Sequence, residues 1–145
     1  MNRSTFLRAA LAAAATTALP LPHASAQTDE GLVIVTNPLL KGIDTEMVRR
    51  IYTGRVVELD GLPLRPVNLA PASPVRQRFL RALLQQTEQD YVGYWTVRRY
   101  IGKGVPPQDL RSSDEVIDYV TRTPGAVAYL DAKDLRPGLQ VVLRR

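Results

Sequence analysis

Ser73, Pro74, Arg76 and Arg78 open a predicted helix whose first turn carries positive charge and no acidic residue. A helix start exposes unpaired backbone N–H groups and the positive end of the helix dipole. Because acidic side chains usually offset this charge, a start that adds arginines is expected to receive an anion from elsewhere. We expect the Ser73 hydroxyl, the free N–H groups and Arg76 to bind phosphate, sulfate or a carboxylate. A tolerated electrostatic cost of about 0.3–1 kcal/mol per charge explains the same pattern without any ligand.

The other predicted helices place their charges in the usual order. The helices that begin after Asp44, Thr87 and Ser112 each have acidic residues in the first turn and arginine in the last turn. This order stabilises a helix because it complements the helix dipole at both ends. The reversed order after Ser73 is therefore a feature of one helix and not of the whole composition.

Asn37 and Gly125 are two further candidate ligand residues. Asn37 closes a continuous apolar run and is followed by proline, so its amide is expected at the mouth of the sheet, where α/β proteins bind ligands. Gly125 follows Pro124 and can present its N–H group to a ligand. A structural alternative stands for both residues, because Asn37 can end a strand and Gly125 can supply a turn.

Two absent residue types exclude most enzyme chemistry. The chain contains no cysteine, which excludes disulfides, thiolate nucleophiles and sulfur-bound metals. Its only histidine is His23, which lies in the predicted signal peptide. A Ser-His-Asp triad, a histidine base and a histidine-ligated metal are therefore excluded in the mature chain. We expect a protein that is not an enzyme and that needs no cofactor or metal.

The first 26 residues have the pattern of a signal peptide. Arg3 and Arg8 precede an apolar segment rich in alanine, and Ala24-Ser25-Ala26 fits the small-residue cleavage site. We expect residues 1–26 to be removed, residues 27–145 to form one domain, and the protein to reside in the periplasm. The formal net charge of +5 suits an anionic ligand, whereas the dispersed arginines do not predict binding to nucleic acid.

Apolar runs alternate with helical patterns along the mature chain. This alternation predicts an α/β single domain with a mixed sheet flanked by helices. The first run is apolar throughout, which favours a buried parallel strand. The segment 103–110 reads as a loop because it contains Gly104 and two prolines. Strands are expected at 31–36, 55–59, 64–68, 126–130 and 139–143, and helices after Asp44, Ser73, Thr87 and Ser112.

Several short motifs, in order, resemble those of phosphate-transporter substrate-binding proteins. The passage Gly31-Leu32-Val33-Ile34-Val35-Thr36-Asn37-Pro38 and the later Ile51-Tyr52-Thr53-Gly54 are similar to one such motif. The segment Leu64-Arg65-Pro66-Val67-Asn68, followed by Ser73 and Phe79, resembles the phosphate loop of these proteins. A third motif of these proteins leads into a strand, and it resembles the passage Thr123-Pro124-Gly125-Ala126-Val127-Ala128-Tyr129.

The resemblance implies a type II periplasmic binding protein fold in a short version with a single lobe. Of the phosphate-loop residues only the serine carries over, onto Ser73. The implied partners are inorganic phosphate or a related oxyanion, a membrane permease or sensor, and a second copy of the chain in a homodimer. The alternative is the same fold with a degraded ligand site, which would act as an interaction module.

Overall fold

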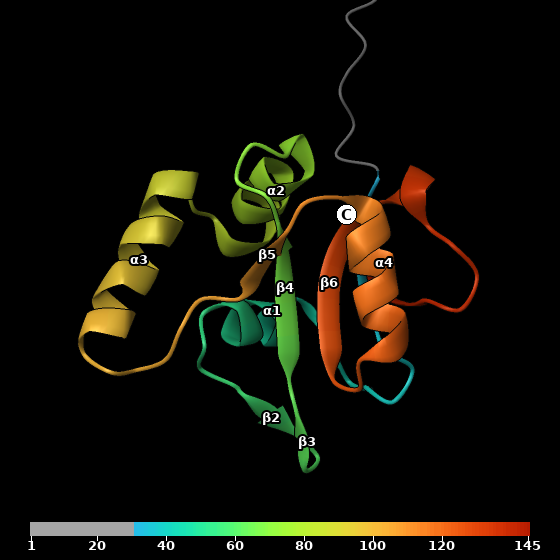
Figure 1. Ribbon diagram of the computed structural model, residues 1–145, viewed down its shortest axis with the longest axis horizontal. Helices are drawn as coiled ribbons and strands as arrows, with labels where there is room; N and C mark the ends of the chain where they lie inside the picture. The colour runs from blue at the N-terminus through green and yellow to red at the C-terminus, as the bar shows by residue number, and fades with distance from the viewer. Residues whose placement is uncertain (1–30) are drawn as a thin grey trace, which may run out of the picture.

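The computed structural model describes residues 31–145, so the predicted signal peptide and the start of the mature chain lie outside the described residues. Five strands form one sheet in the spatial order β5-β4-β6-β1-β7 (Figure 1). Their bounds are β1 (Leu32–Thr36), β4 (Arg65–Leu69), β5 (Gln108–Leu110), β6 (Ala126–Asp131) and β7 (Gln140–Arg144).

The sheet is mixed, as predicted. Strand β4 runs parallel to both β5 and β6, whereas β1 pairs antiparallel with β6 and with β7. The expectation that the first strand is parallel was therefore wrong. All five residues of β1 are buried, and a central antiparallel strand with both faces covered needs the same continuous apolar run as a parallel one.

Helices cover both faces of the sheet and form at the predicted places. Figure 1 shows α4 (Ser113–Arg122) in front of the sheet and α1 (Thr45–Tyr52) behind it. Helix α3 (Glu88–Tyr100) stands beyond the β5 edge, and its first turn is fixed by a capping box between Thr87 and Asp90. None of the helices within residues 31–145 is long and apolar enough to cross a membrane.

The helix predicted after Ser73 changes its geometry part-way. Helix α2 (Pro74–Phe79) passes into a π-helical segment, η1 (Leu80–Leu84), which ends where Gln85 adopts a left-handed conformation. Phe79 is buried in α2, and Leu80 and Leu83 are buried in η1. The predicted apolar stripe is therefore present, although one regular helix does not carry all of it.

Two segments differ from the expected strands. The run 55–59 contributes only β2 (Glu58–Leu59), which pairs with β3 (Leu62–Pro63) in a separate two-stranded hairpin. Strand β5 lies inside the segment 103–110, which was expected to be a loop. Its three residues are mostly polar and exposed, so they carry no apolar pattern that would indicate a strand.

An aromatic cluster joins the sheet to the helices behind it. The rings of Phe79 and Tyr129 stack with their centroids 4.0 Å apart, and the Tyr52 ring lies 4.6 Å from that of Phe79. The Tyr52 hydroxyl donates to the backbone oxygen of Val67 at 2.7 Å. This packing holds α1, the end of α2 and β6 together.

Candidate functional site

The four predicted ligand residues lie at opposite ends of the central strands of the sheet. Ser73 and Arg76 follow the carboxyl end of β4, whereas Asn37 and Gly125 lie where β1 ends and β6 begins. Because β1 is antiparallel to β6, the end of β1 meets the start of β6 and not its carboxyl end. The structure therefore does not bring the four residues into one site, and a ligand role for each of them stays a prediction.

The Asn37 amide is engaged within the protein. Its Nδ2 donates to the backbone oxygen of Val120 at 3.2 Å, and its Oδ1 accepts from the backbone N–H of Leu39 at 3.3 Å. The side chain is buried, with 8% of its surface exposed. These contacts end β1 and tie the following loop to α4.

Gly125 is explained by its backbone geometry. Its φ of +80° is a conformation that glycine adopts readily, and a Cβ atom there would lie 2.0 Å from the backbone oxygen of Pro63. Its carbonyl oxygen accepts from the backbone N–H of Arg65 at 2.8 Å. The residue thus allows the close approach of two chain segments, and a ligand role for it remains untested.

Ser73 forms the N-cap of α2, as the sequence predicted. Its Oγ accepts from the backbone N–H of Arg76 at 3.5 Å, which is a long hydrogen bond. Pro74 occupies the first helical position, and the first turn contains no acidic residue. Within α2 itself, therefore, no acidic side chain offsets the positive charge of the helix start.

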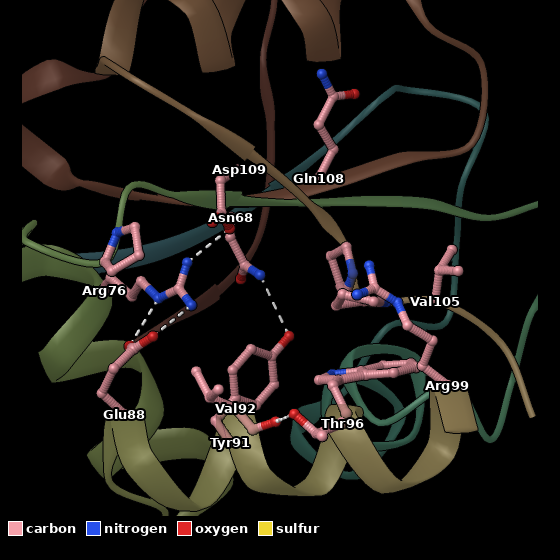
Figure 2. A pocket seen from close by; sticks show the side chains of 14 residues that line it. Asn68, Arg76, Glu88, Tyr91, Val92, Thr96, Arg99, Val105, Gln108 and Asp109 are labelled. Atoms are coloured by element: carbon pink, nitrogen blue, oxygen red, sulfur yellow. Dashed lines mark hydrogen bonds and ion pairs between the residues drawn. The ribbon is translucent and has the colours of Figure 1, made fainter. Parts of the chain in front are cut away.

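Carboxylates of the same chain surround the Arg76 guanidinium. Its Nε and Nη2 donate to the two Glu88 oxygens at 2.8 and 2.6 Å, and its Nη1 donates to Asp109 Oδ1 at 2.7 Å (Figure 2). Nη1 also donates to the backbone oxygen of Leu69 at 2.9 Å. Only 3% of the Arg76 side chain is exposed, whereas 30% of Glu88 and 47% of Asp109 are exposed.

These contacts stabilise the charged form of Arg76. Burial alone would lower the pKa of its guanidinium, but the hydrogen bonds that it donates to Glu88 and Asp109 outweigh burial and raise that pKa. Arginine has five N–H donors, and the four hydrogen bonds above use four of them. One N–H on Nη2 has no acceptor among residues 31–145.

Arg78 makes a second ion pair on the same helix. Its Nη2 lies 2.6 Å from Asp131 Oδ2, and both side chains are less than one-third exposed. The positive charge of α2 therefore does attract anions from elsewhere, but in the structure they are three carboxylates of this chain. Whether an external anion also binds there is left as a prediction.

A buried polar network lies beside Arg76. The Tyr129 hydroxyl accepts from the backbone N–H of Leu69 at 3.1 Å and donates to Asn68 Oδ1 at 3.3 Å. Asn68 Nδ2 in turn donates to the Tyr91 hydroxyl at 3.2 Å, and the Tyr91 ring lies 5.6 Å from the Arg76 guanidinium carbon. Burial raises the pKa values of Tyr91 and Tyr129, so both hydroxyls stay protonated and fix the orientation of Asn68.

A cavity of about 400 Å³ opens beside this network, between α3 and the segment 105–109. Figure 2 shows Asn68 and Tyr91 on one side of the cavity and Arg99 and Val105 on another. Trp95 also lines it, and the indole Nε1 is buried without a hydrogen-bond partner among residues 31–145. An unpaired buried donor is costly, so this N–H is the unsatisfied feature of the cavity.

Sequence reasoning missed three residues of this region. Glu88 was interpreted only as a charge in the first turn of its helix, and Trp95 was not among the predicted site residues. Asp109 lay in the segment expected to be a loop. The three come together only because α3 and β5 pack beside β4. No group of histidine, cysteine, aspartate or glutamate in the described part of the chain could hold a metal ion.

Comparison with known proteins gives a likeness in structure and none in sequence. No family model and no curated protein matches the chain. A solved ABC-type phosphate transport receptor from Vibrio cholerae matches 78% of this chain with a TM-score of 0.60 and 16% identity. PstS from Borrelia burgdorferi matches 77% with a TM-score of 0.57 and 18% identity. The chain shares the fold of these receptors.

A third structure agrees with this assignment. It is a putative phosphate ABC transporter substrate-binding protein with bound phosphate from Clostridium perfringens, which matches 78% of this chain with a TM-score of 0.60 and 16% identity. The match covers 44–46% of each receptor, so the chain spans less than half of their length. The predicted receptor fold in a single lobe is therefore confirmed. At these identities the likeness establishes the fold, and ligand and partners remain proposals.

Proposed function

We propose that this receptor-like protein is an exported, non-catalytic solute-binding protein whose ligand is phosphate or a similar oxyanion. The shared fold supports a binding role, since two of the matched structures are named as a phosphate transport receptor and a phosphate transporter substrate-binding protein. The predicted signal peptide supports export to the periplasm. The lack of cysteine and of any histidine after His23 supports a role without catalysis.

The proposal rests on two side chains with N–H groups, Arg76 and Trp95, that line the same cavity. Arg76 retains one N–H on Nη2 without an acceptor, and Trp95 Nε1 is buried without a partner within the described chain. Both residues line the cavity next to Asn68 and Asp109, which lie on neighbouring parallel strands. A tetrahedral oxyanion offers several acceptor oxygens to such donors, and Arg99 at the same cavity adds a positive charge.

Glu88 and Asp109 limit the affinity of the cavity for an oxyanion. Each carboxylate already accepts from Arg76 and would lie near a bound anion. The two arginines and two acidic residues of the cavity balance in charge, so the attraction of an oxyanion depends on short hydrogen bonds and weakens with salt. In this proposal Ser73 acts by capping α2 behind Arg76, whereas Asn37 and Gly125, at the opposite ends of the strands, are not part of the site.

The chain supplies its own reporter for a direct test. Trp95 is the only tryptophan and lines the cavity, so its fluorescence reports on this part of the molecule. We expect phosphate, and sulfate as a second probe, to change that fluorescence saturably at low ionic strength. A calorimetric titration of Trp95→Phe, which keeps a ring but removes the N–H, should show weaker binding. No saturable change in fluorescence or heat with either anion would contradict the proposal.

Ser73 allows a matched control. Ser73→Ala removes the N-cap of α2, and Ser112→Ala removes the equivalent N-cap of α4, which accepts from the backbone N–H of Glu115 at 3.2 Å. Each change should cost about 1 kcal/mol of folding stability. Only Ser73→Ala should also weaken phosphate binding, because only α2 positions Arg76. Equal effects of both variants on binding would remove Ser73 from the site.

A further inference from the structure

The C-terminal end of α3 exposes several apolar side chains close together. Val97, Tyr100 and Ile101 are 60%, 91% and 56% exposed, and Val105, in the loop that follows the helix, is 70% exposed. Residues three and four apart are neighbours on a helix surface, so Val97 lies beside both Tyr100 and Ile101. We call these four residues the α3 tip. They are four of the seven large apolar side chains exposed within residues 31–145, so exposed apolar surface is concentrated here.

The loop after the helix holds the α3 tip in a defined shape. Gly102 ends the helix with a φ of +71°. The backbone N–H of Lys103 then donates to the backbone oxygen of Arg98 at 2.8 Å, which closes the C-terminal cap. Arg98 Nη2 donates to the backbone oxygens of Gly54 and Lys103 at 3.1 and 3.0 Å. Because these contacts fix the loop to the body of the protein, the apolar side chains of the tip are presented by a structured segment.

The charges next to the α3 tip are all positive along this part of the chain. The segment 91–108 contains Arg98, Arg99 and Lys103 and no acidic residue. Arg99 and Lys103 are exposed and form no ion pair among residues 31–145. The nearest acidic residue on the helix, Asp90, lies about 15 Å away along the axis, which exceeds the screening length of about 8 Å at physiological salt. The helix dipole favours arginine in the last turn, but Lys103 lies beyond the helix.

We propose that the α3 tip docks on the surface of a lipid bilayer that carries anionic phospholipid headgroups. The apolar side chains of the tip enter the boundary between headgroups and acyl chains, while Arg99 and Lys103 pair with lipid phosphate groups. Tyr100 suits this boundary because its ring is apolar and its hydroxyl is polar. The positive charge and the apolar surface, which lie together at one end of α3, are thereby used by a single partner.

Shape and size favour a bilayer over a partner protein. Figure 1 shows α3 and the loop that follows it at one end of the longest axis of the molecule. A specific protein interface buries about 800 Å² on each partner through about 20–30 residues, and the few side chains of the tip fall short of that. A bilayer needs no such area, because a few inserted side chains and a few cations are enough for reversible binding. Its evenly spread negative charge also needs no matching pattern of partner residues.

The test measures co-sedimentation of the mature protein with lipid vesicles. One set of vesicles is pure phosphatidylcholine, and the other is an equal mixture of phosphatidylcholine and phosphatidylglycerol. We expect binding to the anionic vesicles that weakens as salt is added, and little binding to the neutral ones. The buffer contains no phosphate or sulfate, and the tip residues changed below, Ile101 and Lys103, do not line the cavity beside Arg76. Failure of this test is therefore distinct from failure of the proposed oxyanion site.

Two matched double variants locate the docking surface. Ile101→Ser with Lys103→Glu removes an exposed apolar side chain at the tip and reverses a charge two residues further on. Leu39→Ser with Lys41→Glu makes the same changes elsewhere, since Leu39 is 66% exposed and Lys41 is exposed as well. Both variants have the same net charge. Because one basic residue at an anionic surface contributes about fivefold in affinity, the first variant should bind more than about tenfold more weakly and the second less than about twofold.

A fluorescent label tests insertion directly, because the natural chain has no cysteine. Tyr100→Cys and Leu39→Cys each provide one attachment point for a dye whose emission depends on polarity. On anionic vesicles the dye at position 100 should brighten and shift to shorter wavelength, whereas the dye at position 39 should not change. The absence of binding to anionic vesicles would overturn the proposal. Equal losses in the two double variants, or equal responses from the two labels, would place the contact elsewhere and overturn it as well.

Discussion

Arg76 and Glu88 form a two-point ion pair that links the start of α2 to the start of α3, with donor–acceptor distances of 2.8 and 2.6 Å. Glu88 lies in the first turn of α3, where a negative charge is favourable in itself. It therefore compensates two helix starts at once, its own and that of α2. This relationship explains how α2 tolerates arginine in a position where the other helices have acids.

Loss of Arg76 should destabilise the protein strongly. Arg76→Met would leave Glu88 and Asp109 without their shared cation and the backbone oxygen of Leu69 without its donor. We expect a loss of about 3–5 kcal/mol in the free energy of unfolding, measured with urea. Arg81→Met, at an exposed position of η1, should change that free energy by less than about 0.5 kcal/mol. Similar losses in both variants would contradict the structural role of Arg76.

Asp109 should limit the affinity for oxyanions. Asp109→Asn removes one negative charge next to Arg76 but keeps a side chain of the same shape. If phosphate binds in this cavity, the variant should bind it more tightly, by about fivefold for each kcal/mol of repulsion removed. Asp118→Asn, on α4 and away from the cavity, is the control. Titration of Trp95 fluorescence with phosphate measures both, and an unchanged or weaker affinity in Asp109→Asn would count against this site.

Alanine substitutions at Gly125 and Gly42 separate two reasons for glycine, close packing against another segment and a backbone conformation with positive φ. Both have positive φ, +80° and +70°, but only at Gly125 would a Cβ atom collide with another segment, at 2.0 Å from Pro63 O. Gly42→Ala should cost about 1 kcal/mol, because it adds only the strain of the left-handed conformation. Gly125→Ala should cost clearly more and lower the melting temperature further. Equal costs would show that the close approach to Pro63 is not needed.

The ion pair of Arg78 and Asp131 should make stability depend on acid pH. Burial alone would raise the pKa of the Asp131 carboxyl, but the hydrogen bond and charge of Arg78 lower it below the usual value. Because the folded-state pKa is depressed, the contribution to stability is complete above the ordinary value of about 3.9 and is lost as the pH falls through the folded-state pKa.

Arg78→Met isolates this contribution. Urea unfolding should show the variant about 1 kcal/mol or less below the natural protein at neutral pH, since the pair is partly exposed. The difference should shrink as the pH falls below about 3.9. A difference that grows with acid would show that Asp131 is not held in its charged form by Arg78.

The sequence by itself determined the elements of this protein and the charge at the ends of its helices. Asp44, Thr87 and Ser112 cap α1, α3 and α4 as predicted, because N-capping depends on contacts within one turn. The apolar runs at 31–36 and 126–130 are central strands, as predicted, because a continuous apolar run fits a strand that is covered on both faces. The motif order also indicated the receptor fold that the matched structures confirm.

Only the tertiary structure decided which residues meet. The direction of β1, which separates Asn37 and Gly125 from Ser73 and Arg76, depends on strand pairing across almost one hundred residues. The partners of Arg76 come from positions 12 and 33 residues further along the chain. A helix start rich in positive charge attracts whichever carboxylates the fold brings near. The local sequence does not encode which carboxylates those are, because they come from distant positions in the chain.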